Sequence, residues 1–226
     1  MNTHSPLLNV LNKSIRISGK KLIRDFGEIE KLQSSLKTTG KFVDVAKSNL
    51  QKDLYQVLEK LRPNLIIESS NFEKEDCWIL NLIDSSRNFS RGIDHFFISI
   101  SLKENGKINA CVLYNPIKDE NFYFQTGSGA FKNDYRIRVS ETKRLNNSIC
   151  SFFFANNQLN ENKTLGKIRH ILKDTNLETR ESGSIFYDAS LIASGKIDCL
   201  IFSKSDTHTN SQISFILSET GGFLYK

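Results

Sequence analysis

The chain is 226 residues long, with 38% hydrophobic and 25% charged residues, a composition typical of a globular protein and not of a disordered or fibrous one. Its formal net charge is +6, from 31 Lys and Arg against 25 Asp and Glu, and this modest excess permits an acidic partner without identifying one. No apolar run approaches the ~18 residues of a membrane-spanning helix, and the first residues lack the apolar core of a signal peptide. We therefore expect a cytoplasmic protein.

The N-terminal part of the chain carries the spacing of amphipathic helices. Apolar residues recur at intervals of three and four in LLNVLNKSIRISGKKLIRDF, residues 7–26, and again in VAKSNLQKDLYQVLEKL, residues 45–61. Gly40 and Lys41 fall between these segments and predict a break. Pro63 is expected to stop the second helix, because proline cannot donate a backbone hydrogen bond.

Residues 64–139 change to the signals of β-strands. β-Branched and aromatic residues gather in short runs that are separated by Asn, Gly and Pro. The expected strands cover residues 64–68, 76–84, 95–103, 107–115 and 121–126. Between them, Asn105-Gly106 is typical of a tight hairpin and Asn115-Pro116 is typical of a turn.

Beyond residue 140, strands and helices alternate. The expected strands 148–155, 177–181, 196–202 and 221–225 are separated by helices near 162–173, 184–194 and 208–219. Two helices, a meandering sheet and then alternating elements predict a layered α/β sandwich with two sheets. Because no linker, repeat or low-complexity segment interrupts the chain, we expect one domain over 1–226, with the helices and first sheet in roughly 1–140 and the second α/β part in roughly 141–226.

Polar residues collect at the end of the apolar run WILNL. Asn81 and Asp84 lie three positions apart there, and Ser85 and Ser86 follow directly. A carboxylate at the C-terminal end of a strand suits Mg²⁺, which prefers oxygen ligands. The following residues predict a short helix whose free N–H groups attract phosphate, although Asp84 can equally be no more than the cap of that helix. Glu68 ends the preceding strand and joins Asp84 if the two strands are neighbours.

Two long stretches of the sequence resemble the inositol monophosphatase family. The first runs from WILNLIDSSRNF to YRIRVS, and the second is SGSIFYDASLIASGKIDCLIF followed by SETGGFLY. The matching positions, in order, are Trp78, Asp84, Asn88, Phe89, Gly92, Phe96, Ser99, Ile100, Tyr114, Pro116, Gly127, Gly129, Ala130, Asn133, Gly183, Ser184, Asp188, Gly195, Asp198, Glu219, Gly221 and Gly222. The resemblance covers essentially the whole chain and implies the αβαβα sandwich of this family, usually paired as a homodimer.

The resemblance also implies a chemistry. Members of the family hydrolyse inositol or sugar phosphates with two or three Mg²⁺ ions, which bind the phosphate and lower the pKa of an attacking water. The implied catalytic residues are Glu68, Asp84 and Ser86; the implied metal positions are Glu68, Asn81, Ile83, Asp84 and Thr209; and the implied substrate-binding residues are Ser85, Ser86, Arg87, Gly183 and Ser184.

Several positions depart from the family's pattern. Asn81 and Thr209 replace two aspartates of the metal cluster, Ser69 replaces one glutamate of a pair, and Phe202 replaces a substrate-binding glutamate. The sequence also stops at Lys226, where family members continue with another strand and helix. Each lost carboxylate–cation contact forfeits on the order of 4 kcal/mol at ~4 Å and an effective dielectric constant of ~20. Even half of that energy, lost at two positions, weakens metal binding by about three powers of ten, so we expect impaired or absent catalysis.

Three functional interpretations remain open. The first is an active Mg²⁺-dependent phosphatase with atypical ligands, the second is a non-catalytic protein that binds a phosphorylated small molecule, and the third is a protein-interaction or regulatory factor. Arg87 and Arg91 can neutralise a phosphate in place of metal ions, or they can face solvent or pair with acids such as Asp94. Direct nucleic-acid binding is unsupported, because the basic residues belong to no recognised nucleic-acid module.

The cysteines give no sign of a metal site. Cys77, Cys111, Cys150 and Cys199 lie far apart, with no Cys-x-x-Cys pair and no metal-ligand spacing among them. Unpaired cysteines of a cytoplasmic protein behave as small apolar side chains. We therefore expect four buried, reduced thiols.

Overall fold

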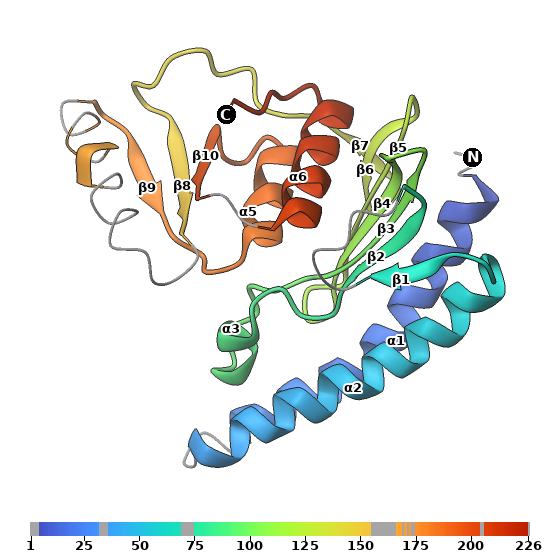
Figure 1. Ribbon diagram of the computed structural model, residues 1–226. Coiled ribbons are helices and arrows are strands. Elements are labelled where there is room, and N and C mark those ends of the chain that lie inside the picture. Colours follow the sequence, from blue (N-terminus) through green and yellow to red (C-terminus); the bar gives the residue numbers. More distant parts are fainter. Residues whose placement is uncertain are drawn as a thin grey trace.

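The computed structural model describes residues 5–31, 36–68, 75–154, 166–168, 170, 172, 175–203 and 206–225, with the side chains of 30, 31, 36–39 and 68 outside that description. Helices and sheets alternate in layers (Figure 1). Helices α1 (Pro6–Lys31) and α2 (Leu36–Leu61) cover one face of a seven-stranded sheet. Helices α5 (Ile185–Ala193) and α6 (Thr207–Thr220) lie between that sheet and a three-stranded sheet, and helical residues 166–168 lie beyond the smaller sheet. This arrangement is the αβαβα sandwich that the sequence predicts.

The strands of the larger sheet follow one another in chain order. The pair β1–β2 is parallel, and each later pair is antiparallel. The strands are β1 (Ile66–Glu68), β2 (Cys77–Asn81), β3 (Ile98–Glu104), β4 (Lys107–Asn115), β5 (Glu120–Gln125), β6 (Gly129–Lys132) and β7 (Tyr135–Ile137). The first five confirm the strand predictions. Strands β6 and β7 were not predicted, because strands of 4 and 3 residues are too short to display a clear alternation.

The predicted turns between strands are confirmed. Asn105 and Gly106 have φ values of 52° and 73°, and a two-residue hairpin turn of this type needs positive φ at both positions. They join β3 to β4. After β4, the Asn115 side chain accepts hydrogen bonds from the backbone N–H groups of Ile117 and Lys118, at 3.0 and 3.1 Å, and so closes the turn around the proline.

Three parallel strands form the smaller sheet. They lie in the order β10 (Cys199–Phe202), β8 (Ile149–Phe153) and β9 (Glu178–Arg180), and they confirm the three strands predicted between residues 148 and 202. The helix expected near 162–173 falls mostly outside the described residues, and 166–168 within it are helical.

Two predictions near helix ends are wrong. Helix α2 continues through Gly40 without a break, because one glycine costs a helix only about 1 kcal/mol, which the burial of its apolar face offsets. The expected strand at 221–225 is irregular: Gly221 takes a left-handed conformation with φ 84° that ends α6, and no described strand pairs with the residues after it. The stop before Pro63 is confirmed, since α2 ends at Leu61.

The larger sheet is buried on both faces, and this determines where its side chains go. Alternate side chains of a strand point to opposite faces. On β2, Trp78 and Leu80 pack in the layer with α1 and α2, whereas Cys77 and Ile79 pack toward α5 and α6. The apolar run of this strand is therefore continuous, as expected for a strand covered on both sides. None of the described helices has the length and apolar character needed to cross a membrane.

Gly19 allows α1 to pack closely against the larger sheet. A Cβ atom at this position would lie 2.7 Å from Cε1 of Tyr114 and 3.2 Å from Cδ1 of Ile98. Overpacking of this kind costs roughly 1–3 kcal/mol, and the gain in helix propensity returns about 1 kcal/mol. We expect Gly19→Ala to lower the free energy of unfolding by about 1 kcal/mol, measured by urea unfolding followed by circular dichroism.

Gly27→Ala is the matched control in the same helix. A Cβ atom at Gly27 meets nothing within 4 Å, so the alanine should raise the free energy of unfolding by roughly 0.5–1 kcal/mol. Changes of the same sign in the two variants would contradict the close packing at Gly19.

Candidate functional site

The short helix α3 (Ser86–Ser90) follows the strand β2 and confirms the helix predicted there. Its N-terminal cap is Ser85, whose hydroxyl accepts a hydrogen bond from the Asn88 backbone N–H at 3.4 Å. The interpretation of Asp84 as the cap is therefore wrong. Phe89 holds α3 in place, because its ring packs edge-on against Phe96 at 5.0 Å and lies 5.8 Å from Phe26 of α1.

The carboxylate of Asp84 joins three separate parts of the chain. Its Oδ1 accepts a hydrogen bond from the Phe97 backbone N–H at 2.7 Å, just before β3. Its Oδ2 accepts one from the Phe186 backbone N–H at 3.1 Å and one from the Ser184 hydroxyl, both at the start of α5. The Asp84 backbone N–H also donates to the Phe97 carbonyl at 3.2 Å. Asp84 thus occupies the N-terminus of α5, where the positive end of the helix dipole favours a negative charge.

Asn88 makes a second connection between the same segments. Its side-chain amide donates to the His95 carbonyl at 2.7 Å and to the Ser182 carbonyl at 2.8 Å. Gly183 adjoins it with φ +78°, and a Cβ atom on Gly183 would lie 3.3 Å from Asn88 Oδ1. Asn88 was not predicted to have a role at the site, although its place in the family's Asn-Phe pair was a usable signal.

The start of α5 brings a further acid into the site. Ser184 caps this helix by accepting a hydrogen bond from the Tyr187 backbone N–H at 3.0 Å, while its own hydroxyl donates to Asp84. Asp188 follows in the first turn with a side chain that is 1% exposed. One of its oxygens, Oδ2, has no hydrogen-bond partner among the described residues.

Both acids hold their protons more tightly than ordinary carboxyl groups. Burial raises the pKa of Asp84 to about 6, although hydrogen bonds from Ser184, Phe97 and Phe186 act to lower it. Burial likewise raises the pKa of Asp188 to about 6, and the nearby charge of Asp84 adds to the rise. The charge of Asp84 acts on Asp188 because both acids lie at the start of α5.

The ends of β1 and β2 carry three more of the implied metal positions, Glu68, Asn81 and Ile83. Each of them offers a different kind of donor. Strands β1 and β2 are parallel neighbours, so their carboxyl ends meet at one edge, with the Glu68 backbone paired to Ile79. The Glu68 side chain lies outside the described residues. Asn81 ends β2 opposite Ser99 and offers a neutral amide. The side chain of Ile83 is buried in the apolar layer with α1 and α2, which leaves its backbone carbonyl as its only possible ligand atom.

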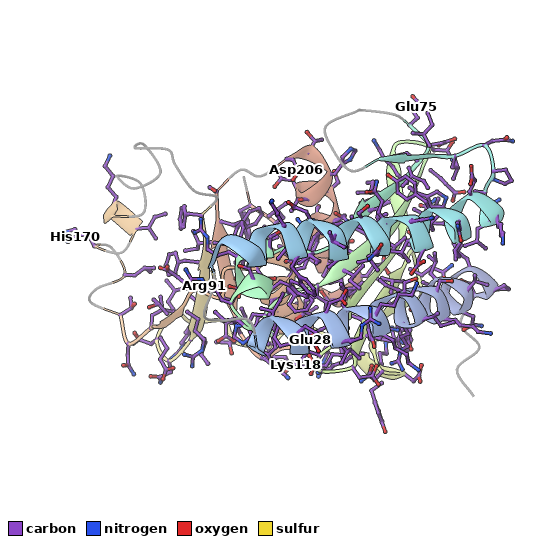
Figure 2. The ribbon with its side chains drawn as sticks, turned by 90° about the horizontal axis from the view of Figure 1, so that it is seen from below. Glu28, Glu75, Arg91, Lys118, His170 and Asp206 are labelled. Carbon is purple, nitrogen blue, oxygen red and sulfur yellow. The ribbon has the colours of Figure 1, made fainter. Side chains whose placement is uncertain are left out.

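Thr209 is engaged by a neighbour on its own helix. Asp206 caps α6, and its carboxylate accepts hydrogen bonds from the Thr209 backbone N–H at 2.8 Å and from the Thr209 hydroxyl at 2.7 Å. Figure 2 labels Asp206 at the start of this helix. Sequence reasoning missed Asp206, although an Asp three residues before a helical Thr is a common capping pattern.

The residues implied in substrate binding are spread between α3 and the start of α5. Ser86 is half-buried in the first turn of α3, whereas Arg87 and Arg91 are exposed, with Arg91 at the end of α3 (Figure 2). Asp94, which the sequence offered as a partner for these arginines, forms an ion pair with Lys118 at 3.5 Å, and its other carboxylate oxygen lies 3.4 Å from Nε2 of His95.

The described donors do not fit a cluster of two or three Mg²⁺ ions. Among the described side chains, which leave out that of Glu68, no group of three or more His, Cys, Asp or Glu residues is placed to hold a metal ion. A carboxylate offers about four lone-pair sites, and protein donors take three of those of Asp84. Asn81 supplies a neutral oxygen, and the Thr209 hydroxyl is hydrogen-bonded to Asp206.

Comparison with known proteins places this geometry in a family. Residues 3–213 match the Inositol monophosphatase family. The chain belongs to this family. It is 34% identical to an inositol-1-monophosphatase of Rhizobium meliloti over 86% of this chain and 75% of that protein. It is 27% identical to the Nus factor SuhB of Pasteurella multocida, over 86% of this chain and 75% of that protein. The crystal structure of the extragenic suppressor protein suhB from Bartonella henselae matches with a TM-score of 0.81 and 29% identity, over 97% of this chain and 86% of that one.

We expect Asp188 to make the free energy of unfolding of this inositol monophosphatase-family protein depend on pH. Because its pKa rises from 3.8 to about 6 on folding, the folded state binds this proton more tightly than the unfolded state. The bound proton stabilises the folded state fully when the pH is below 3.8, the pKa of Asp188 in the unfolded chain. This stabilisation is lost as the pH rises through about 6, its pKa in the folded protein. At 1.36 kcal/mol per pKa unit the loss is on the order of 3 kcal/mol. We expect Asp188→Asn to remove this share of the decrease in unfolding free energy between about pH 4 and pH 7, measured by urea titration.

Asp198→Asn is the control for this pH dependence. Although burial opposes it, hydrogen bonds from the Ser140 hydroxyl and the Ile149 N–H lower the pKa of Asp198, so its stabilisation is lost only as the pH falls below the ordinary Asp value. In Asp198→Asn, the free energy of unfolding should still decrease between about pH 4 and pH 7 as it does in the native protein. An equally shallow decrease in both variants would exclude Asp188 as the specific source.

Proposed function

We propose that this inositol monophosphatase-family protein keeps a site for a phosphorylated small molecule, of the inositol or sugar phosphate class, while its Mg²⁺-dependent hydrolysis is impaired or absent. Glu68 and Asp84 are the carboxylates left for a metal, with Asn81, Ile83 and Thr209 as the altered positions. Ser85, Ser86, Arg87, Gly183 and Ser184 are the proposed substrate-binding residues, and Ser86 is also a proposed catalytic residue.

The hydrogen bonds of Asp84 are the main support for this function. Both of its carboxylate oxygens already accept hydrogen bonds from Phe97, Phe186 and Ser184. Burial raises its pKa to about 6, so near and below that pH a cation must compete with a proton that the folded protein binds more tightly than usual. With neutral groups at Asn81 and Thr209, few negative oxygens are left to concentrate magnesium beside a phosphate.

The loss of metal-binding energy is large enough to impair catalysis. A loss of about 2 kcal/mol at each of two former carboxylate positions weakens metal binding by roughly three powers of ten. Phosphate-monoester hydrolysis is among the slowest uncatalysed reactions and needs a very large acceleration. A weakly held metal supplies that acceleration only at high magnesium concentration.

Restoring the two carboxylates tests the proposed impairment. We expect the native protein to hydrolyse inositol 1-phosphate slowly or not at all across a Mg²⁺ titration, because its metal affinity is reduced. The double variant Asn81→Asp, Thr209→Asp should lower the Mg²⁺ requirement by up to about three powers of ten and raise turnover, as measured by phosphate release. Efficient native turnover at low Mg²⁺ would instead establish an active phosphatase with atypical ligands.

Binding without metal tests the retained site. In EDTA, calorimetric titration with inositol 1-phosphate should detect binding. Arg87→Ala should weaken it by roughly ten-fold or more, because a hydrogen bond to a charged group contributes about 1.5–3 kcal/mol. Arg24→Ala is the control, since Arg24 lies exposed on α1. Absence of binding in EDTA would end the case for a metal-free anion site, and equal weakening by both variants would exclude a specific role for Arg87.

A non-catalytic interaction role is the second candidate. Its support is the 27% identity to a protein named as the Nus factor SuhB. Activity in neither the native protein nor the double variant, together with no ligand binding in EDTA, would favour this role. The homodimer, the cytoplasmic location and the single domain implied by sequence and resemblance remain predictions alongside both functions.

A further inference from the structure

The smaller sheet brings together two cysteines that are distant in the sequence. Strands β8 and β10 pair in parallel, and Cys150 of β8 is directly opposite Cys199 of β10. Residues directly opposite each other on neighbouring strands point to the same face of the sheet. The two thiols therefore lie side by side, and both cysteines are free.

The spacing of neighbouring strands suits a bond between these residues. Adjacent strands lie about 4.7–4.9 Å apart, and disulfides join Cα atoms that are roughly 4.4–6.8 Å apart. A bridge between paired strands stays within that range without moving the backbone far. Because its torsion is constrained by the sheet, such a bridge is also more easily reduced than an ordinary structural disulfide.

The two thiols have different environments. Cys150 is 1% exposed, whereas Cys199 is only partly buried and so remains accessible to a small oxidant. The prediction of a buried thiol is therefore wrong for Cys199. Hydrogen bonding between them lowers the pKa of Cys199 to about 7 and raises the pKa of Cys150 above its usual range. Near neutral pH, a substantial fraction of Cys199 is therefore the thiolate, which is the nucleophilic form, while Cys150 keeps its proton.

The other two cysteines form no comparable pair. Cys77 lies on β2 and Cys111 on β4, with β3 between them. Both are fully buried, and burial raises the pKa of Cys111 to about 12. They therefore provide an internal control for oxidation at the smaller sheet.

We propose that Cys150 and Cys199 form a reversible dithiol site, which hydrogen peroxide oxidises to an intramolecular disulfide. The Cys199 thiolate attacks one peroxide oxygen, the O–O bond breaks, and the released hydroxide takes a proton to become water. Cys199 is then a sulfenic acid. The Cys150 sulfur attacks the Cys199 sulfur and loses its proton, the S–O bond breaks, and a second water leaves. The two thiols together lose two electrons and two protons, which balances the reduction of one peroxide to two waters.

This site is independent of hydrolysis, because neither cysteine is among the proposed metal or substrate-binding residues. Its position still links it to the candidate site. Burial raises the pKa of Asp188 on α5, and the hydroxyl of Ser151, which follows Cys150 on β8, opposes that rise. A covalent bond between β8 and β10 would therefore form beside a strand that contacts the buried acid.

Thiol counting and peptide mapping on the full chain test this proposal. The reduced protein contains 4 cysteines. After treatment with a small molar excess of hydrogen peroxide, we expect two thiols to disappear, the intact mass to fall by two hydrogens, and a non-reduced digest to contain a peptide joining Cys150 to Cys199. Dithiothreitol should restore all four thiols. A wild-type protein that keeps four thiols, forms only disulfides between chains, or gains oxygen in place of losing hydrogen would overturn the proposal.

Single substitutions distinguish this pair from general oxidation. Cys199→Ser and Cys150→Ser should each keep all three remaining thiols free of a disulfide under the same treatment. Cys111→Ala should still lose two thiols and give the same cross-linked peptide. Loss of the disulfide in Cys111→Ala, or its persistence in Cys199→Ser, would contradict the assignment, and the wild-type peptide map decides even if a variant folds poorly.

Discussion

The carboxylate of Asp84 is the interaction on which the candidate site depends. It receives hydrogen bonds from the Phe97 and Phe186 backbones and from the Ser184 hydroxyl, and so connects the segment after β2 to β3 and to α5. A buried carboxyl group is costly unless it finds such donors, and a donor without its acceptor is costly as well. The larger sheet and the α5–α6 layer are therefore joined at the same residue that the family resemblance assigns to metal binding. Asn88 reinforces this junction with two further hydrogen bonds.

The same junction determines the electrostatic environment of the site. In a cluster that binds several Mg²⁺ ions, many negative oxygens must converge, and their mutual repulsion is relieved by the ions. Here burial keeps the pKa values of Asp84 and Asp188 near 6, while Asn81 is neutral and Thr209 donates to Asp206. Asp84 and Thr209 thus already have hydrogen-bond partners within the protein. The family architecture is thus compatible with a site whose polar residues serve the fold as much as they serve a ligand.

Local pattern accounted for most of the secondary structure. Strong β-forming runs identified five strands of the larger sheet, and Asn105-Gly106 identified the β3–β4 turn, because these signals act over a few residues. The failures came where packing outweighed a local signal. Gly40 did not interrupt α2, since tertiary contacts offset the cost of a glycine, and Asp84 was not the helix cap, since its carboxylate met donors from distant segments. The pairing of Thr209 with Asp206 is local and was predictable from capping rules.

The sequence by itself determined the family, the layered fold and the position of the candidate site along the chain, because ordered motifs and periodicity are properties of neighbouring residues. The tertiary structure alone decided which side chains meet. Asp84 meets Ser184, and Cys150 lies opposite Cys199, although no spacing in the sequence pairs them. Such contacts depend on the order and register of the strands and on how the helices pack between the two sheets. These are set by burial over the whole molecule, and a shift of one residue in register would turn each side chain to the other face.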